Sequence, residues 1–167
     1  PLDTLSSHKL FVESIKDSQL QNICLCSPDF GGIKRLKAYK QIIDADIAVI
    51  NKERLKPNQV AHMEIIGDVK GKNVIIIDDL VDTAGTLCKA ADLLIKEGAA
   101  SVQAYCTHGV LSGNAIDNIQ KSHLKHICIS DTVRDDLTDH KIKIVSCAPL
   151  LAKAIENLIN NKSLSQL

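Results

Sequence analysis

The chain has few aromatic side chains and no excess of charge of either sign. Among its 167 residues there are two Phe, two Tyr and no Trp, and 20 Lys and Arg residues balance 20 Asp and Glu residues. Single-stranded bases usually stack on aromatic side chains, and a nucleic-acid backbone attracts a positive field. The composition therefore argues against nucleic-acid binding, and any phosphate chemistry must come from local clusters.

Long apolar runs and metal-type cysteine spacings are also missing. No apolar run approaches the roughly 20 residues of a membrane span, and no secretory leader pattern is visible. The six cysteines form no C-x-x-C or Cys/His zinc spacing; Cys24, Cys26, Cys106 and Cys128 lie inside apolar runs. We expect reduced, buried thiols in a soluble, cytoplasmic protein with no membrane partner. The first residue is Pro, which suggests that the chain begins inside a longer one.

Short β-branched runs alternate with amphipathic stretches along the chain. With 45% hydrophobic residues, residues 1–167 are expected to form one domain with its own core. The pattern predicts an α/β fold, a mostly parallel twisted sheet flanked by helices, with ligands beyond the carboxyl ends of the strands. Strands are expected at 22–26, 46–50, 63–66, 74–77, 102–106, 127–130 and 142–145, and helices at 7–16, 32–43, 84–96, 113–122 and 148–160.

The most informative segment is VIIIDDLVDTAGT, residues 74–86. Four apolar residues lead into Asp78 and Asp79, and residues 82–86 then open a helix. Small residues let the backbone wrap closely around a ligand, and free N–H groups at a helix start suit a phosphate monoester. Adjacent carboxylates would repel that phosphate, so we expect them to face a sugar diol or Mg²⁺ instead.

Two other interpretations of this segment deserve comparison. A buried strand that ends in solvated Asp residues before an N-capped helix would show a similar hydrophobic-DD pattern. The strand and its acids also look like a Walker B motif, but the nearest Walker A candidate, residues 67–73, has the wrong spacing and lacks the Ser or Thr after Lys. A nucleotide-binding P-loop is therefore not expected.

The thirteen residues resemble the motif with which phosphoribosyltransferases and phosphoribosyl pyrophosphate (PRPP) synthetases bind PRPP. Further segments resemble the synthetases in order along the chain: SPDFGG (27–32), IGDV (66–69), TLCKAA (86–91), THGVLSGNA (107–115), Asp131 with Thr132, and SLSQL (163–167). The chain is thus similar throughout to ribose-phosphate diphosphokinases, which have a type I phosphoribosyltransferase-like fold. Ala84 departs from the pattern, since many members have Gly or Cys there.

The resemblance implies an enzyme that transfers diphosphate from Mg-ATP to the C1 hydroxyl of ribose 5-phosphate, producing PRPP and AMP for nucleotide biosynthesis. Lys52 and Arg54 would belong to a catalytic loop at 52–61, or to an ordinary solvated basic loop. Asp29 would hold Mg²⁺, or be an ordinary Pro-Asp turn residue. Ser163 and Ser165 would lie near a regulatory phosphate site, or be ordinary tail residues. Ribose 5-phosphate would be bound by Asp78, Asp79, Asp82, Thr83, Ala84, Gly85 and Thr86.

Members of this family are about twice as long and contain two related domains. The chain would be the C-terminal half, without most of the ATP contacts, and would assemble as a homo-oligomer of dimers within hexamers. A self-contained phosphoribosyltransferase and a non-catalytic regulatory subunit are the alternatives. Arg35 is expected in an exposed salt bridge, with a phosphate contact and an interface role as the alternatives. His108 is expected in a structural or interface role.

Overall fold

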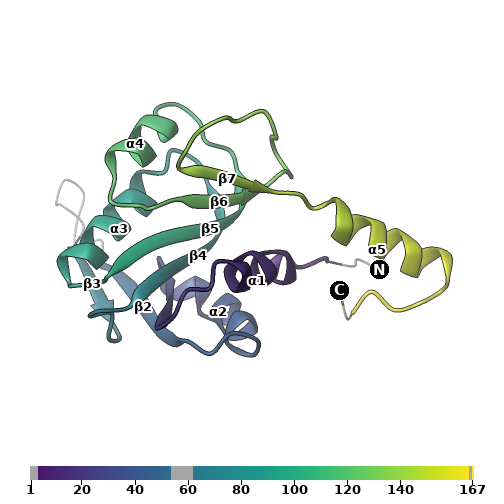
Figure 1. Ribbon diagram of the computed structural model, residues 1–167, viewed down its shortest axis with the longest axis horizontal. Coiled ribbons are helices and arrows are strands. Elements are labelled where there is room, and N and C mark those ends of the chain that lie inside the picture. Colours follow the sequence, from purple (N-terminus) through teal and green to yellow (C-terminus); the bar gives the residue numbers. More distant parts are fainter. Residues whose placement is uncertain (1–3, 54–61, 166) are drawn as a thin grey trace.

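In the part of the chain that the computed structural model describes, residues 4–53, 62–165 and 167, seven strands form one sheet (Figure 1). Their order is β3-β2-β1-β4-β5-β6-β7, and each neighbouring pair is parallel except β2 with β3. The strands are β1 (Ile23–Ser27), β2 (Asp46–Glu53), β3 (His62–Ile66), β4 (Asn73–Val81), β5 (Ser101–Gly109), β6 (Ile127–Ser130) and β7 (Ile142–Val145). The predicted α/β class is confirmed.

Helices cover both faces of the sheet, which explains why the strands are apolar at consecutive positions. The helices are α1 (His8–Asp17), α2 (Ile33–Lys40), α3 (Gly85–Lys96), α4 (Ala115–Lys121) and α5 (Ala148–Ile159), and a 3-10 turn, η1 (Phe30–Gly32), precedes α2. Figure 1 shows α1 and α2 on one side of the sheet and α3 and α4 on the other. Leu25 packs into the core under α1 and α2, whereas Cys24 and Cys26 pack into the core under α3 and α4.

Strand β4 is longer than the sequence predicted. We expected it to end at Ile77, but its ladder with β5 continues to Val81, with Asp78 opposite Cys106 and Leu80 opposite His108. Parallel pairing with β5 supplies backbone partners beyond the apolar run, so hydrophobicity alone placed the end too early. Asp78 and Asp79 therefore lie on a strand rather than after it.

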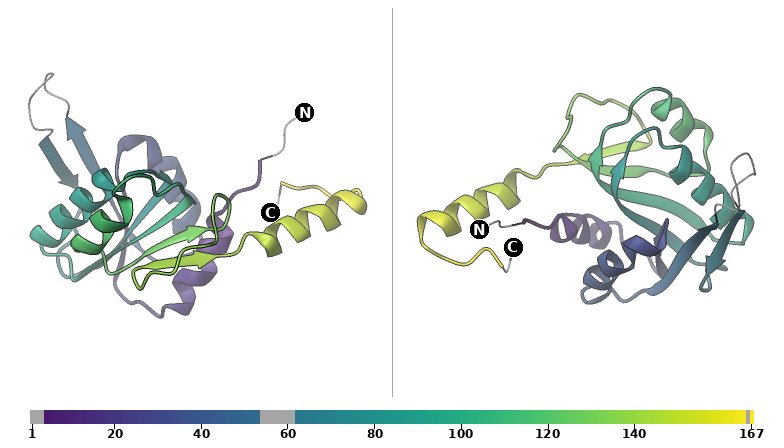
Figure 2. Two further views of the ribbon diagram at one scale, coloured as in Figure 1. Left: turned by 90° about the horizontal axis from the view of Figure 1, so that it is seen from above. Right: turned by 180° about the vertical axis from the view of Figure 1, so that it is seen from behind.

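Strands β2 and β3 form an antiparallel hairpin that extends from one end of the sheet (Figure 2, left view). The predicted return strand at 63–66 is confirmed. The predicted loop at 52–61 began too early, because Lys52 pairs with Met63 and belongs to β2. Arg54 lies outside the described residues.

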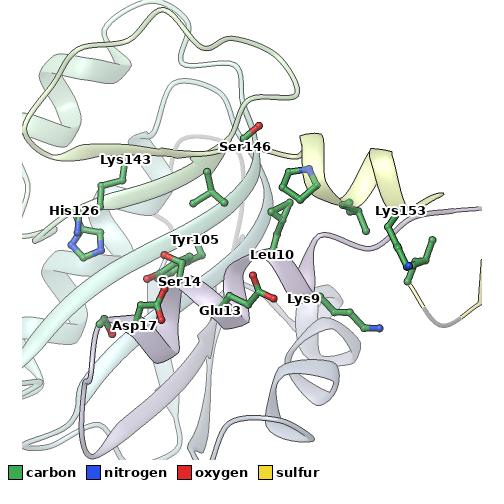
Figure 3. A pocket seen from close by; sticks show the side chains of 15 residues that line it. Lys9, Leu10, Glu13, Ser14, Asp17, Tyr105, His126, Lys143, Ser146 and Lys153 are labelled. Carbon is green, nitrogen blue, oxygen red and sulfur yellow. The ribbon is translucent and has the colours of Figure 1, made fainter. Parts of the chain in front are cut away.

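Helix α5 projects away from the sheet (Figure 2). In the part of the chain that the structure describes, no helix combines the length and apolar character that crossing a membrane requires. The first turn of α5 borders a cavity of about 750 Å³, which it shares with α1 and the β5–β7 face (Figure 3). The exposed apolar side chains of α5 are Leu151, Ile155, Leu158 and Ile159.

The six cysteines are free thiols, and five of them are buried. Cys24, Cys26, Cys106 and Cys128 lie on β1, β5 and β6, as the sequence predicted, and Cys88 lies on the buried face of α3. Burial raises the pKa of the thiols of Cys24 and Cys128 to about 11. These cysteines act as small core hydrophobes.

Gly67, directly after β3, is required by both its backbone conformation and its surroundings. Its φ is +117°, and an added Cβ would lie 2.7 Å from the Ile47 carbonyl oxygen. Gly71 also has a positive φ, +70°, but its added Cβ would meet nothing within 4 Å. We expect Gly67→Ala to lower the free energy of unfolding by about 2–3 kcal/mol and Gly71→Ala by about 1 kcal/mol, measured by urea denaturation. Equal losses would contradict the role of the backbone contact.

Candidate functional site

The sheet changes winding direction between β1 and β4. From β1 the chain continues outward to β2 on one side, whereas β4, β5, β6 and β7 follow one another on the other side. In α/β proteins of this type, ligands bind beyond the carboxyl ends of the strands at such a switch point. The turn after β1 carries Asp29, and the end of β4 carries Asp78 and Asp79. The fold thus brings three predicted site residues to the same edge of the sheet, at the switch point.

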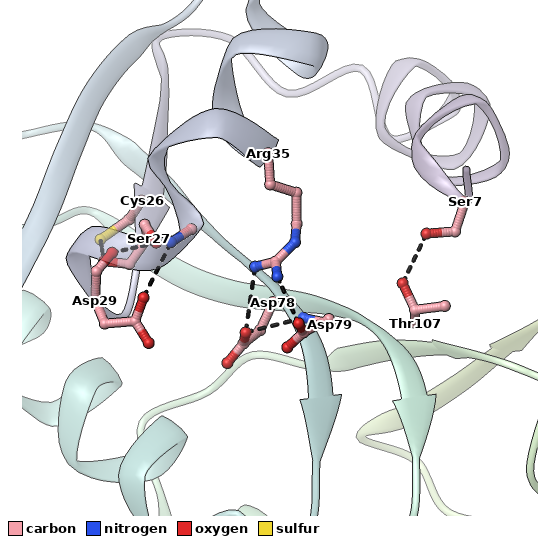
Figure 4. A network of polar contacts seen from close by, with 9 residues as sticks. Ser7, Cys26, Ser27, Asp29, Arg35, Asp78, Asp79 and Thr107 are labelled. Atoms are coloured by element: carbon pink, nitrogen blue, oxygen red, sulfur yellow. Dashed lines mark hydrogen bonds and ion pairs between the residues drawn. The ribbon is translucent and has the colours of Figure 1, made fainter. Parts of the chain in front are cut away.

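Arg35, on α2, joins the two carboxylates of β4 (Figure 4). Its Nη1 lies 3.3 Å from Oδ1 of Asp78, and its Nη2 lies 2.7 Å from Oδ2 of Asp79. The backbone N–H of Asp79 also donates to Oδ1 of Asp78, at 2.9 Å. The predicted salt bridge of Arg35 is therefore present, but its partners are the acids of the candidate sugar site, which the sequence did not indicate.

Asp78 is held in an environment that favours its neutral form. Burial raises the pKa of the Asp78 carboxyl to about 6, and the neighbouring Asp79 carboxylate adds to the increase. The backbone N–H of Asp79 and the Arg35 guanidinium act in the opposite direction. The charge of this carboxyl therefore changes close to neutral pH, which is typical of residues at functional sites.

The loop after β4 folds around a small hollow of about 270 Å³. Ala84 adopts the left-handed conformation, with φ 58° and ψ 1°, immediately before α3 begins at Gly85. This conformation is unfavourable for a residue with a Cβ, so it explains why Gly suits this position in the family motif. The hollow is lined by Asp78, Leu80, Val81, Asp82, Thr83, Ala84, Gly85, Thr86, Leu87 and Cys106.

Residues from the segment after β5 hold this loop in place. The hydroxyl of Ser112 donates to Oδ1 of Asp82, and Nδ2 of Asn118 donates to the Thr83 carbonyl at 2.9 Å. Leu111 N donates to the Val81 carbonyl at 3.2 Å. No role for Ser112 could be predicted, although it lies in the matched THGVLSGNA segment; in the structure its hydroxyl supports the loop through Asp82.

Asp29 shapes the turn after β1. Its Oδ1 accepts the Gly32 N–H at 3.0 Å and caps η1, and its carbonyl accepts the Ser27 hydroxyl at 2.6 Å (Figure 4). Among the described residues, no three His, Cys, Asp or Glu side chains gather closely enough to hold a metal ion. Mg²⁺ commonly takes only one or two protein carboxylates together with phosphate oxygens, so Asp29 fits a site that a substrate completes.

The remaining predicted residues come from other parts of the chain than β1, β4 and the loop after β4. Lys52 stands near the end of β2, at the same edge as the ends of β1 and β4, because β1 is parallel to both neighbours. Ser163 and Ser165 follow α5, are hydrogen-bonded to each other at 2.8 Å, and their role is a prediction. His108 donates to or accepts from the Thr132 hydroxyl at 2.8 Å, a link between the ends of β5 and β6.

The sheet, its switch point and the loop after β4 together define an α/β protein of the type I phosphoribosyltransferase-like class. The protein-family model described as "Phosphoribosyl synthetase-associated domain" matches residues 50–167, and the chain belongs to this family. The predicted similarity to ribose-phosphate diphosphokinases is confirmed.

Individual relatives agree with this assignment. A ribose-phosphate pyrophosphokinase of Cereibacter sphaeroides is 43% identical over 173 residues, which cover 100% of this chain and 52% of that protein. The phosphoribosylpyrophosphate synthetase of Mycobacterium smegmatis has a TM-score of 0.85 and 29% identity over 96% of this chain and 53% of its own. A purine phosphoribosyltransferase of Pyrococcus horikoshii shares the fold, with a TM-score of 0.51 and 19% identity. The chain spans about half the length of the synthetases it matches.

The raised pKa of Asp78 predicts that Asp78→Asn increases the stability of the fold in a pH-dependent way. Because the folded state holds the proton more tightly than the unfolded state, native stability is lost as pH rises from 3.8 to about 6. Asn stays neutral and keeps an oxygen for Asp79 N–H and Arg35. We expect the Tm of Asp78→Asn to exceed that of the wild type by a few °C, roughly, at neutral pH, and the gain to vanish below about pH 4.

Differential scanning calorimetry across this pH range measures the effect. Asp78→Ala is the matched control, because it removes the charge and the acceptor oxygen together, so the gain should be absent. A difference between Asp78→Asn and wild type that stays constant with pH would contradict the assignment.

Proposed function

We propose that this chain is the sugar-phosphate half of a ribose-phosphate diphosphokinase. The reaction transfers the diphosphate of Mg-ATP to the C1 hydroxyl of ribose 5-phosphate. A new bond forms from that hydroxyl oxygen to the β-phosphorus. The bond from the β-phosphorus to the oxygen that bridges it to the α-phosphorus breaks, and AMP leaves with that oxygen. The hydroxyl loses its proton. The products are PRPP and AMP.

One observation carries this proposal. Beyond the two acids of β4, the chain makes a left-handed turn at Ala84 and begins the twelve-residue helix α3, and Thr83, Ala84, Gly85 and Thr86 line a 270 Å³ hollow. Backbone N–H groups and the two threonine hydroxyls are the donors that these residues can offer a ligand. A helix N-terminus framed by small residues is suited to a phosphate monoester. We assign residues 82–86 to the 5-phosphate of the sugar.

The carboxylates of Asp78 and Asp79 then accept hydrogen bonds from the ribose hydroxyls. Asp78 lines the same hollow as the loop, so a sugar whose phosphate lies on the loop can reach it. Carboxylates accept hydrogen bonds from hydroxyls strongly and repel a phosphate. The ligand is therefore oriented with its hydroxyls toward the carboxylates and its phosphate toward the loop. This division assigns the phosphate and the sugar to different atoms of one strand-loop-helix unit.

The donor side of the reaction needs groups that this chain supplies only in part. Asp29 would hold Mg²⁺ together with the phosphates of ATP, and the metal would neutralise their charge. Lys52, with Arg54, would stabilise the negative charge that develops at the β-phosphorus in the transition state. We propose that most ATP contacts come from an N-terminal half, and that the whole protein assembles as a homo-oligomer of dimers within hexamers, with a regulatory phosphate near Ser163 and Ser165.

A self-contained phosphoribosyltransferase is the second candidate, because enzymes of that class share the fold of this chain. The Pyrococcus horikoshii purine phosphoribosyltransferase is covered over 84% of its own length, against about half for the synthetases. Such an enzyme would consume PRPP and a nucleobase and release diphosphate. The matched segments of the sequence, such as SPDFGG, favour the synthetase.

The two candidates predict different turnover. We expect this chain to release no AMP from Mg-ATP and ribose 5-phosphate, because transfer requires donor and acceptor to be held in line and the donor contacts are incomplete. We also expect no diphosphate from PRPP with purine or pyrimidine bases. Coupled assays for AMP and diphosphate measure both, with the Cereibacter sphaeroides relative as a positive control. AMP release at the control rate would contradict the division of contacts, and robust diphosphate release would favour the second candidate.

The binding step is tested by filling the loop. An added Cβ at Gly85 would meet only the Thr83 hydroxyl, at 3.9 Å, so a side chain there enters the hollow without displacing the core. We expect Gly85→Val to lower the affinity for ribose 5-phosphate at least about tenfold in calorimetry, with little change in Tm. Lys89→Ala, an exposed change on the same helix, is the control and should bind like wild type. Unchanged binding by Gly85→Val would remove residues 82–86 from the site.

A further inference from the structure

Asp78 and Asp79 are neighbours on a strand, and neighbours on a strand point to opposite faces of a sheet. The core residues of β4 follow this rule up to Ile77: Ile75 and Ile77 pack toward α1 and α2, and Ile76 packs toward α3. The alternation is interrupted further along the strand, since Val81 packs toward α3 as well. Asp78 and Asp79 follow Ile77 directly, and as neighbours on a strand their side chains leave the backbone in different directions.

The cavities around the end of β4 agree with this separation. Asp78 lines the 270 Å³ hollow of the phosphate loop, together with Ala84. Asp79 lines a different hollow, of about 450 Å³, together with Arg35 and His108. A group that brings the two carboxylates together is therefore needed before both can contact one diol.

The Arg35 guanidinium is placed to do this. It binds one oxygen of each carboxylate through two different nitrogens, at 3.3 Å and 2.7 Å (Figure 4). A planar guanidinium presents several donors in a fixed fork, whereas a lysine ammonium is a point charge on a flexible stem. The fork can hold two carboxylates in a defined mutual orientation, which a single ammonium cannot reproduce.

The surroundings of Arg35 keep the guanidinium in this position. The neighbouring helix residue Leu36 is buried in the core, so the backbone of α2 is fixed against the sheet. A Cβ at Gly32 would lie 3.2 Å from Nη1 of Arg35 and 2.2 Å from the hydroxyl of Ser27. The second glycine of SPDFGG therefore leaves the space in which the side chain of Arg35 reaches β4.

Charge gives the same residue a second effect. A phosphate monoester carries about −1.5 to −2 charges near pH 7. Two adjacent carboxylates would repel such a ligand, and the Arg35 guanidinium offsets part of their charge. The side chain of Arg35 is only 29% exposed, so solvent screens this effect less than it screens a surface pair.

We propose that Arg35 is a positioning residue of the sugar site, which holds Asp78 and Asp79 so that both accept hydroxyls of the same vicinal diol. The inference rests on the proposed function and adds a residue that binds the carboxylates rather than the substrate. Its consequence is selectivity: the paired carboxylates recognise two neighbouring hydroxyls, and a sugar that lacks one of them leaves an acceptor without its partner.

The test compares ribose 5-phosphate with 2-deoxyribose 5-phosphate, which lacks one hydroxyl of the diol. Calorimetry on the wild-type chain should show a preference for ribose 5-phosphate of about tenfold or more. Arg35→Ala should reduce this preference to about twofold or less, and Arg35→Lys should restore part of the overall affinity through its charge but little of the preference. Lys34→Ala, an exposed change one residue away on α2, should keep both.

The preference for ribose 5-phosphate over 2-deoxyribose 5-phosphate distinguishes two roles for Arg35. One is to position the carboxylates, and the other is only to connect α2 to β4. Loss of such a connection would lower Tm and weaken both sugar phosphates equally, leaving their ratio unchanged. A retained preference in Arg35→Ala overturns the inference; if that variant does not fold, a preference in Arg35→Lys equal to wild type overturns it. Failure of the wild type to bind either sugar phosphate would refute the proposed function itself, and the inference with it.

Discussion

The parallel pairing of β1 with β4 is the contact on which the candidate site depends. These strands are separated by more than forty residues in sequence, yet Cys24 pairs with Val74 and Cys26 with Ile76. The connections leave this pair in opposite directions, so side chains do not fill the crevice at its carboxyl edge. Because both strands are buried by helices on their two faces, the polar residues that follow them are held on a rigid base.

Opposite charges are distributed along that edge in an order suited to a molecule with a charged end and a neutral end. The N-terminus of α3 and its loop favour an anion, whereas the two carboxylates favour hydroxyl donors. Arg35 pairs with the two acids and not with the loop, so the loop remains available to the phosphate. The left-handed turn at Ala84 is a strained conformation, and such strain is commonly found where a backbone must approach a ligand closely.

Local sequence predicted most of the fold, because consecutive apolar residues mark strands that are buried on both faces. It also identified the loop at 82–86, where all the residues are adjacent in the chain. It could not show the pairing of Arg35 with Asp78, which joins residues 43 positions apart, nor the support of Asp82 by Ser112. The ends of β2 and β4 were misplaced for a related reason: polar residues follow the apolar run of each strand, Asn51 and Lys52 in β2 and Asp78 and Asp79 in β4, and pairing with neighbouring strands keeps the chain in the sheet beyond that run.

The buried cysteines can be used to measure how often the folded sheet opens. With no tryptophan, the chain has little intrinsic fluorescence with which to follow unfolding. Five thiols are enclosed in the core, and the sixth, Cys147, has its pKa raised by its contact with Asp131. The thiolate is the form of cysteine that attacks alkylating reagents, so the folded protein should take up label slowly at neutral pH. The rate of labelling at Cys24, Cys106 and Cys128 then measures how often the central strands of the sheet open to solvent.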